Sequence, residues 1–128
     1  MANKTTKKHF ELFKKECQFW IDILNLNNYE INFSHESCEF YGEKIFAMTS
    51  RTYNSRYVDI IFSDTFHDKE PTDELIKRYA QHEVFEVLLN DMWILASARS
   101  WDEDQWDAAG HDLIHRLQYM SKKLMEMK

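Results

Sequence analysis

The sequence predicts an α+β fold in which helices cover one face of a small, mostly antiparallel sheet. Near both ends of the chain, apolar residues recur every three or four positions, which is typical of helices with one buried face. Between these segments apolar and polar residues alternate, which is typical of strands. The chain has 128 residues, of which 44% are hydrophobic, so we expect a single domain over residues 1–128 with its own core.

The first predicted helix covers residues 5–26. Its large apolar residues fall on one face because they are spaced three and four apart. These residues are Phe10, Phe13, Cys17, Trp20 and Leu24. Asn25, Asn27 and Asn28 then favour a turn, because asparagine side chains compete with the helix for backbone hydrogen bonds.

A strand is predicted over residues 29–35, where apolar and polar residues alternate. The segment that follows, residues 36–44, fits two interpretations. It forms either a turn around Gly42 or a short edge strand.

Two further strands are predicted over residues 45–53 and 56–63. Only Asn54 and Ser55 separate them. Because the connection is short, we expect the two strands to form an antiparallel hairpin.

A second helix is predicted to begin at Thr72 and to run to about Ala98. Thr72 can cap its N-terminus, while Asp73 and Glu74 suit the positive end of the helix dipole. Pro71 stops the chain before the helix begins.

A final helix is predicted after a polar break over residues 100–105. It starts either near Trp101, with Ser100 as its cap, or near Asp104. One face of this helix carries four long apolar side chains: Leu113, Leu117, Met120 and Leu124.

Composition narrows the classes of partner. The net charge of −6 argues against general binding to nucleic acid and permits binding to basic partners. The acidic residues are scattered, which indicates an ordinary acidic surface, and imitation of DNA by that surface is an alternative.

There is no long apolar run and no apolar segment after the basic residues 1–8, so we expect no membrane span and no secretory signal. Cys17 and Cys38 lack metal-type spacing, which indicates free thiols in a cytoplasmic protein.

The run from His82 to Glu86 is the main candidate for chemistry. On a helix His82 and Glu86 lie one turn apart on the same face, and both side chains are competent zinc ligands. Glu83 lies on the neighbouring flank, where a general base for a metal-bound water would sit. Alternatively, Glu83 and Glu86 are solvated or paired helix carboxylates, and His82 is a hydrogen-bonded core histidine.

A catalytic zinc site normally takes three protein ligands, so a third ligand must come from another element. His111 and His115 lie four residues apart on the last predicted helix, with Asp112 between them. If this helix packs antiparallel to the motif helix, His111 comes within reach of the pair, and His115 is the alternate ligand. The remaining histidines are interpreted as surface or loop residues: His9, His35 and His67.

Three stretches of the chain resemble small phage and prophage metallopeptidase-like proteins of zincin type, which carry the motif His-Glu-x-x-His. Residues 81–89 resemble their active-site helix, and residues 110–117 resemble a second block near the C-terminus. Residues 24–31 resemble the entry from the first helix into the sheet, with Tyr29 where Trp is usual. The resemblance implies a minimal zincin-like fold: an N-terminal helix, a sheet of three to four strands, the motif helix and a closing helix.

The resemblance also implies roles for single residues. His82 matches the first zinc ligand, Glu83 the catalytic base, and His111 a histidine of the second block. Two positions depart from the family: Glu86 stands where the second ligand His is usual, and Gly110 stands where a Glu is usual. An added carboxylate makes the metal a weaker Lewis acid, and it favours harder divalent ions, such as Mn or Mg, more than the family's His-rich site does.

Three functions follow as competing hypotheses. The first is a metal-dependent hydrolase that cleaves a peptide, with a zinc ion on His82, Glu86 and His111. The second is a catalytically inactive zincin-like protein, a pseudoenzyme, that binds a host protein. The third is a DNA-mimicking inhibitor, which rests on net charge alone. A phage or prophage origin would place the protein in the host cytoplasm.

Overall fold

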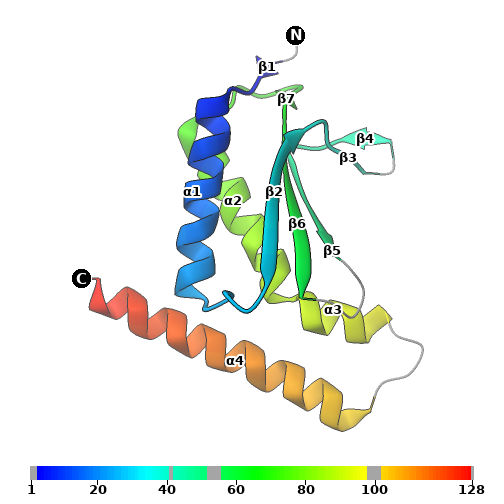
Figure 1. Cartoon of the computed structure of the whole chain (residues 1–128), viewed down its shortest axis with the longest axis vertical. Coiled ribbons are helices and arrows are strands. Elements are labelled where there is room, and N and C mark those ends of the chain that lie inside the picture. Colours follow the sequence, from blue (N-terminus) through cyan, green and yellow to red (C-terminus); the bar gives the residue numbers. More distant parts are fainter. Residues whose placement is uncertain (1–2, 41, 52–55, 98–101, 128) are drawn as a thin grey trace.

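Two helices cover one face of a small sheet, and a third helix crosses their ends (Figure 1). The computed structural model describes residues 3–40, 42–51, 56–97 and 102–127. The α+β class predicted from the sequence is confirmed. The opposite face of the sheet carries no helix in the described part of the chain (Figure 1).

Helix α1 (Lys7–Ile23) begins with a capping box. The Thr6 side chain accepts a hydrogen bond from the His9 backbone N–H at 3.2 Å, and the Thr6 N–H donates to His9 Nδ1 at 3.0 Å. The helix ends at Leu24, and Asn25 takes a positive φ of 54°. The predicted apolar face is confirmed. Three of its five residues are fully buried, and the other two are partly buried against the core: Phe13, Cys17 and Leu24, then Phe10 and Trp20.

The main sheet has the strand order β2 (Glu30–Glu36), β6 (Tyr57–Ser63) and β5 (Ala47–Arg51). Strands β5 and β6 pair antiparallel, as predicted, and their predicted join at Asn54 and Ser55 lies outside the described residues. Strands β2 and β6 pair parallel, whereas the other three described strand pairs are antiparallel, which agrees with the mostly antiparallel pattern expected. The difference arises because the chain reverses direction twice between these two strands.

The segment 36–44 contains both of the predicted features, a turn around Gly42 and short strands. It forms a two-residue hairpin from β3 (Glu39–Phe40) and β4 (Glu43–Lys44). Gly42 lies in the turn with φ +80°, a conformation that glycine adopts without steric cost. The main sheet of the described residues thus has three strands, within the three to four expected, and this hairpin is separate from it.

The start of the chain is tied to the end of the sheet. Strand β1 (Asn3–Lys4) pairs antiparallel with β7 (Thr65–Phe66). Next to this pair, the Thr5 N–H donates to the Asp64 carbonyl at 2.9 Å. These contacts close the top of the molecule over α1 and α2 (Figure 1).

The predicted long second helix is wrong at its C-terminal end. Helix α2 (Asp73–Leu88) stops at Leu89, and a separate helix α3 (Asn90–Ser97) follows. No Gly or Pro marks the break, which is why the sequence pattern runs through it.

The last helix, α4 (Glu103–Glu126), begins next to the predicted start near Asp104. Its cap is Asp102, whose side chain accepts from the backbone N–H three residues on. The other predicted start, near Trp101 with Ser100 as cap, lies outside the described residues. Helix α4 lies across the lower ends of α1 and α2 and contacts α1 and α3 (Figure 1).

The core lies between α1, α2 and the sheet. Phe62 of β6 stacks on Phe13 of α1 with ring centroids 4.7 Å apart, and it meets Phe66 edge-on at 5.7 Å. From α2, four further residues with fully buried side chains complete this layer: Ile76, Ala80, Val84 and Val87.

Among the histidines, His35 departs from the surface or loop role expected. It stands in β2, half-buried, with its ring stacked on Phe10 at 5.0 Å and its Nε2 2.6 Å from the Thr5 hydroxyl. Burial lowers the pKa of His35, and this effect exceeds the opposite pull of Asp64. His9 is the partner of the N-cap residue Thr6 in the capping box of α1, and it is half-buried rather than fully exposed.

Both cysteines are free and buried, which confirms the prediction of free thiols. Burial raises the pKa of the Cys38 thiol to about 12, and it raises the pKa of Cys17 well above its usual range. The nearby carboxylate of Glu83 adds to both shifts. Neither thiol therefore has the character of a nucleophile.

Candidate functional site

Helix α2 carries the His82–Glu86 run in its second half. Thr72 caps the helix by accepting from the Leu75 N–H at 3.3 Å, and Asp73 and Glu74 occupy the first turn, as predicted. The helix packs along α1 and against β5. These contacts fix which side chains of the run face the core and which face solvent.

His82 and Glu86 lie together on the outer side of α2. The His82 Nε2 and the Glu86 Oε1 are 3.5 Å apart, with side chains 66% and 31% exposed. The predicted one-turn spacing on one face is therefore confirmed. The pair forms an ion pair when the imidazole is protonated, and it offers one nitrogen and one carboxylate as metal donors when the imidazole is neutral.

Glu83 has a different environment. It is only 6% exposed, and its Oε1 accepts a hydrogen bond from the Thr49 hydroxyl of β5 at 2.8 Å. The same hydroxyl lies 3.2 Å from the Glu83 backbone carbonyl. Thr49 therefore holds the carboxylate between α2 and the sheet. The sequence analysis missed Thr49, although its place in a predicted strand was the available signal.

The second block does not join the motif. His111 and His115 are both exposed on α4, whose buried residues are Ala109 and Arg116. Gly110 is half-buried, and a Cβ at this position would meet nothing within 4 Å.

Within the described residues, no three His, Cys, Asp or Glu side chains form a group able to hold a metal ion. The structure thus brings together two of the predicted ligands, His82 and Glu86, and leaves His111 and His115 apart from them. Because a catalytic zinc site needs three protein ligands, the donors present do not fit such a site as they stand.

A groove of about 330 Å³ runs beside the motif. Its walls come from α2 and from the segment that leads into β5: Lys44, Ile45, Phe46, Ala47, Arg78, Tyr79, His82 and Glu83. The rings of Phe46 and Tyr79 lie 5.1 Å apart. Partial burial raises the pKa of Tyr79, so its hydroxyl stays protonated at neutral pH.

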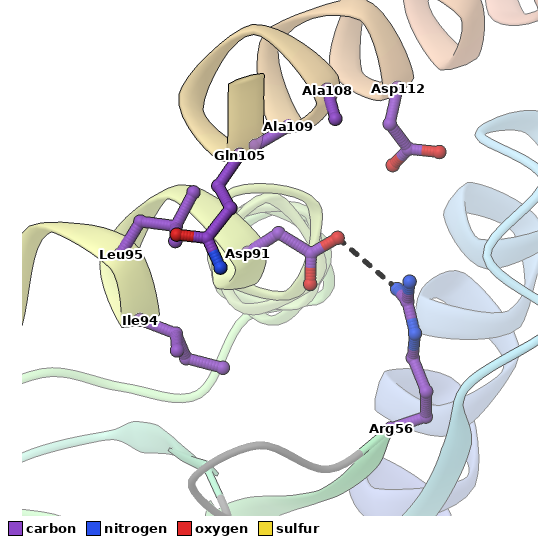
Figure 2. Close-up of a pocket in the computed structure, with 8 residues that line it drawn as sticks. All are labelled: Arg56, Asp91, Ile94, Leu95, Gln105, Ala108, Ala109 and Asp112. Carbon is purple, nitrogen blue, oxygen red and sulfur yellow. Dashed lines mark ion pairs between the residues drawn. The ribbon is translucent and has the colours of Figure 1, made fainter. Parts of the chain in front are cut away.

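A larger cavity, of about 470 Å³, lies between α3, α4 and the start of β6 (Figure 2). Its polar groups are Arg56, Asp91, Gln105 and Asp112, and its apolar wall comes from α3 and α4. Arg56 and Asp91 form an ion pair at 3.3 Å. Both are partly exposed, so this pair is screened by solvent and contributes little stability.

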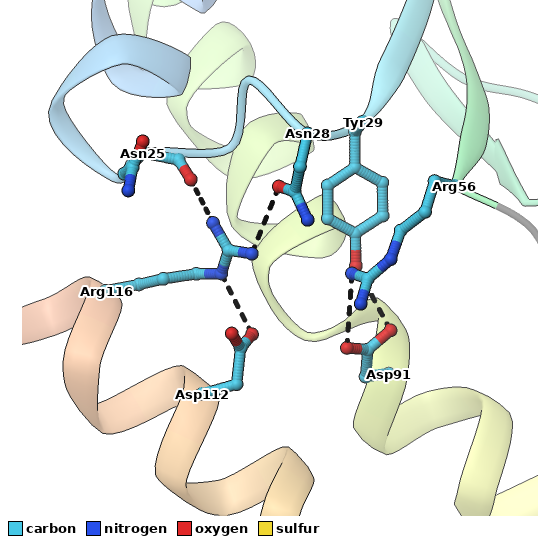
Figure 3. Close-up of polar contacts among 7 residues, drawn as sticks. All are labelled: Asn25, Asn28, Tyr29, Arg56, Asp91, Asp112 and Arg116. Atoms are coloured by element: carbon cyan, nitrogen blue, oxygen red, sulfur yellow. Dashed lines mark hydrogen bonds and ion pairs between the residues drawn. The ribbon is translucent and has the colours of Figure 1, made fainter.

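Polar contacts beside this cavity attach α4 to the rest of the molecule (Figure 3). Arg116 is only 8% exposed, and it donates to Asp112 at 2.9 Å, to the Asn28 side chain at 3.1 Å and to the Asn25 carbonyl. The guanidinium thus joins α4 to the turn after α1. A buried cation needs partners of this kind to offset its lost hydration.

Tyr29 forms a second link in the same region. Its hydroxyl donates to Asp91 at 3.2 Å, and the Arg56 guanidinium lies 4.9 Å from the centre of its ring (Figure 3). Burial raises the pKa of Tyr29, and the Asp91 carboxylate adds to this shift. Arg56 and Asp91, two charged residues of the cavity, therefore have a structural role: they link α3 to the sheet.

Comparisons of the chain with protein-family models, with curated proteins and with solved structures each gave no match. Among the described residues, no helix has the length and apolar character needed to cross a membrane.

Proposed function

We propose that this protein binds an extended peptide segment of another protein in the groove between α2 and the segment that leads into β5. In this proposal it is a catalytically inactive relative of the phage metallopeptidase-like proteins it resembles, and it acts on a host protein in the host cytoplasm. The observation that carries the proposal is the free edge of β5 beside the His82–Glu86 face. Within the described part of the chain, β5 pairs with β6 alone.

Backbone groups of β5 are available on this edge. In an antiparallel pair, alternate residues bond to the partner strand. The Ser63 N–H donates to the Phe46 carbonyl at 2.9 Å, so the next residue, Ala47, directs its N–H away from β6. An added peptide strand would gain its affinity from such groups and its specificity from the groove.

The groove lining favours a particular peptide chemistry. Phe46 and Tyr79 offer aromatic surface to an apolar side chain. Lys44 and Arg78 are both exposed cations at the same groove, which suits a neighbouring acidic side chain. We therefore expect the bound segment to carry an apolar residue close to an acidic one.

The geometry around Glu83 supports binding without cleavage. A general base must reach the proton that it removes, and the Glu83 Oε1 is engaged by Thr49 in a buried position. The predicted third ligand, His111, lies on α4 and exposed. Both observations favour the inactive alternative over the hydrolase.

Selection of random peptides displayed on phage tests the proposal. Peptides enriched on the wild-type protein should lose at least ten-fold in affinity, measured by fluorescence anisotropy, for the variants Ala47→Pro and His82→Ala. His115→Ala, which changes another exposed histidine, serves as the matched control and should bind like the wild type. Equal binding to all three variants would contradict the proposal.

A metal-dependent hydrolase is the second candidate, and the 3.5 Å approach of His82 and Glu86 favours it. In this case zinc or another divalent ion would bind the pair, with a third donor still to be supplied, and Glu83 would be the base. Metal analysis of the purified protein, with His82→Ala as control, separates the candidates. One equivalent of metal that His82→Ala removes would support the hydrolase, and substoichiometric metal that the variant leaves unchanged would exclude it.

A further inference from the structure

Helix α4 carries a row of residues on a flank beside the side that packs against the body, and all of them except the half-buried Gly110 are exposed. The row is Gly110, Ile114, Leu117, Ser121 and Leu124, and it is called the α4 seam below. Ile114 is 53% exposed, Leu117 39% and Leu124 37%. The contacts of α4 with the body come instead from a different side of the helix, where Ala109 and Arg116 are buried.

The spacing of the α4 seam alternates between four and three residues over its whole length. This is the heptad spacing by which one helix packs against another in a coiled coil. The three apolar members of the row remain partly exposed, at 37–53% of their surface, while a neighbouring side of the helix, which carries Ala109 and Arg116, is buried against the body.

We infer that the α4 seam pairs with the α4 seam of a second copy of this chain, with the two helices antiparallel. A two-fold axis between Ile114 and Leu117 would place each of these residues against the other in the second copy. The same register sets Gly110 opposite Ser121 on both sides of the axis, and it places Leu124 at the edge of the contact, opposite Asp107. Two small residues facing each other allow the helices to approach closely, and an interface of this kind is self-complementary.

Charge favours the antiparallel direction. The first turns of α4 are acidic, with Glu103, Asp104 and Asp107, and its last turns carry two lysines, Lys122 and Lys123, against one acidic residue, Glu126. Antiparallel pairing sets the acidic end of one helix near the basic end of the other, and it also pairs opposite ends of the helix dipoles. Parallel pairing would bring like charges together at both ends.

The size of the interface sets the expected affinity. Five seam residues over one helix make a small contact, below the area of a typical permanent dimer. We therefore expect a reversible dimer with a dissociation constant on the order of micromolar.

Sedimentation velocity over a range of micromolar concentrations tests this inference. The wild-type chain should shift from monomer to dimer as concentration rises, whereas Ile114→Glu and Leu117→Glu should remain monomeric. His115→Glu adds the same acidic residue about 100° around the helix from Ile114, so it should dimerise like the wild type. Circular dichroism should show unchanged helix content, because all three positions are exposed.

Two outcomes would overturn the dimer: a wild-type chain that stays monomeric at every concentration, or a dimer that Leu117→Glu does not weaken. Disulfide trapping tests the direction of the helices. A mixture of Gly110→Cys and Ser121→Cys proteins should cross-link under mild oxidation, while Ser121→Cys alone should not, and cross-linking of Ser121→Cys alone would exclude the antiparallel arrangement. The native Cys17 and Cys38 are buried and should not take part.

Discussion

The two halves of the molecule are held together by different forces. In the half made by α1, α2 and the sheet, fully buried apolar side chains form one continuous core. At the other end, the buried residues of α4 are Ala109 and Arg116, and polar contacts carry much of the attachment. The motif helix is therefore part of the apolar core, whereas α4 is attached by the hydrogen bonds of Arg116 together with the packing of Met120 against that core.

This difference bears directly on the metal hypothesis. His82, Glu83 and Glu86 belong to the apolar half, and His111 belongs to α4. A three-ligand site would therefore require side chains of the two halves to be placed with high precision. The half that would supply the third ligand is the one with the fewer buried apolar contacts.

A pair of leucine truncations gives the largest expected contrast between the halves. Leu24→Ala removes a fully buried side chain and should lower the free energy of unfolding by about 2–5 kcal/mol. Leu124→Ala removes a 37% exposed side chain and should change it by about 0.5 kcal/mol or less. Urea denaturation at low protein concentration, where any dimer dissociates, measures both. Equal losses would show that α4 is packed as firmly as the core.

The attachment of α4 is tested by Arg116→Met, with Lys122→Met as a matched exposed control. Loss of the guanidinium leaves the Asn25 carbonyl and the Asn28 side chain without this donor, and we expect a destabilisation of about 2 kcal/mol. Hydrogen exchange should become faster in α4 and remain unchanged in α1 and α2. Unaltered exchange in α4 would mean that apolar contacts hold this helix.

The clamp on Glu83 gives a smaller effect within the apolar half. Thr49→Val keeps the side-chain shape but removes the hydroxyl donor from a buried carboxylate, so we expect a loss of about 1–2 kcal/mol in thermal or urea unfolding. Ser50→Ala, at an exposed position of the same strand, should have almost no effect. If Thr49→Val is as stable as the wild type, Glu83 has other partners that suffice.

The pH dependence of stability gives the smallest expected effect. Because burial lowers the pKa of His35 in the folded state, the unfolded chain binds a proton first as the pH falls. The contribution of neutral His35 to the free energy of unfolding should therefore be fully present above about pH 6.5. It should decline as the pH drops from there to the folded-state pKa. His35→Gln should flatten this part of a urea midpoint series, and His111→Gln should retain it. An unchanged slope in His35→Gln would assign the effect to another group.

Sequence patterns predicted the fold best in segments where the apolar residues follow a single spacing, either that of a helix or that of a strand. The spacing of Phe13 and Cys17 identified the buried face of α1, and the alternation around Val58 identified β6. The break at Leu89 was missed because apolar residues continue through it. The exposure of Leu117 was also missed, since periodicity finds an apolar face without saying what covers it.

For the site, the spacing of His82 and Glu86 was sufficient to predict their proximity, since both lie on one helix. The positions of His111 and Thr49 relative to the motif depend on how separate elements pack, which helical spacing does not contain. Local geometry was therefore predictable, and contacts between elements were not.

The parallel pairing of β2 with β6 has a consequence for how the chain folds. Strands β5 and β6 are neighbours in sequence and can pair early. Strand β2 cannot pair until β6 has been synthesised, and β1 cannot pair until β7 has been synthesised. Phe13 of α1 therefore lacks its stacking partner Phe62 until about half of the chain is available. Such long-range pairing raises the contact order and slows folding, so a nascent chain stopped before residue 57 should expose α1 to chaperones or to aggregation.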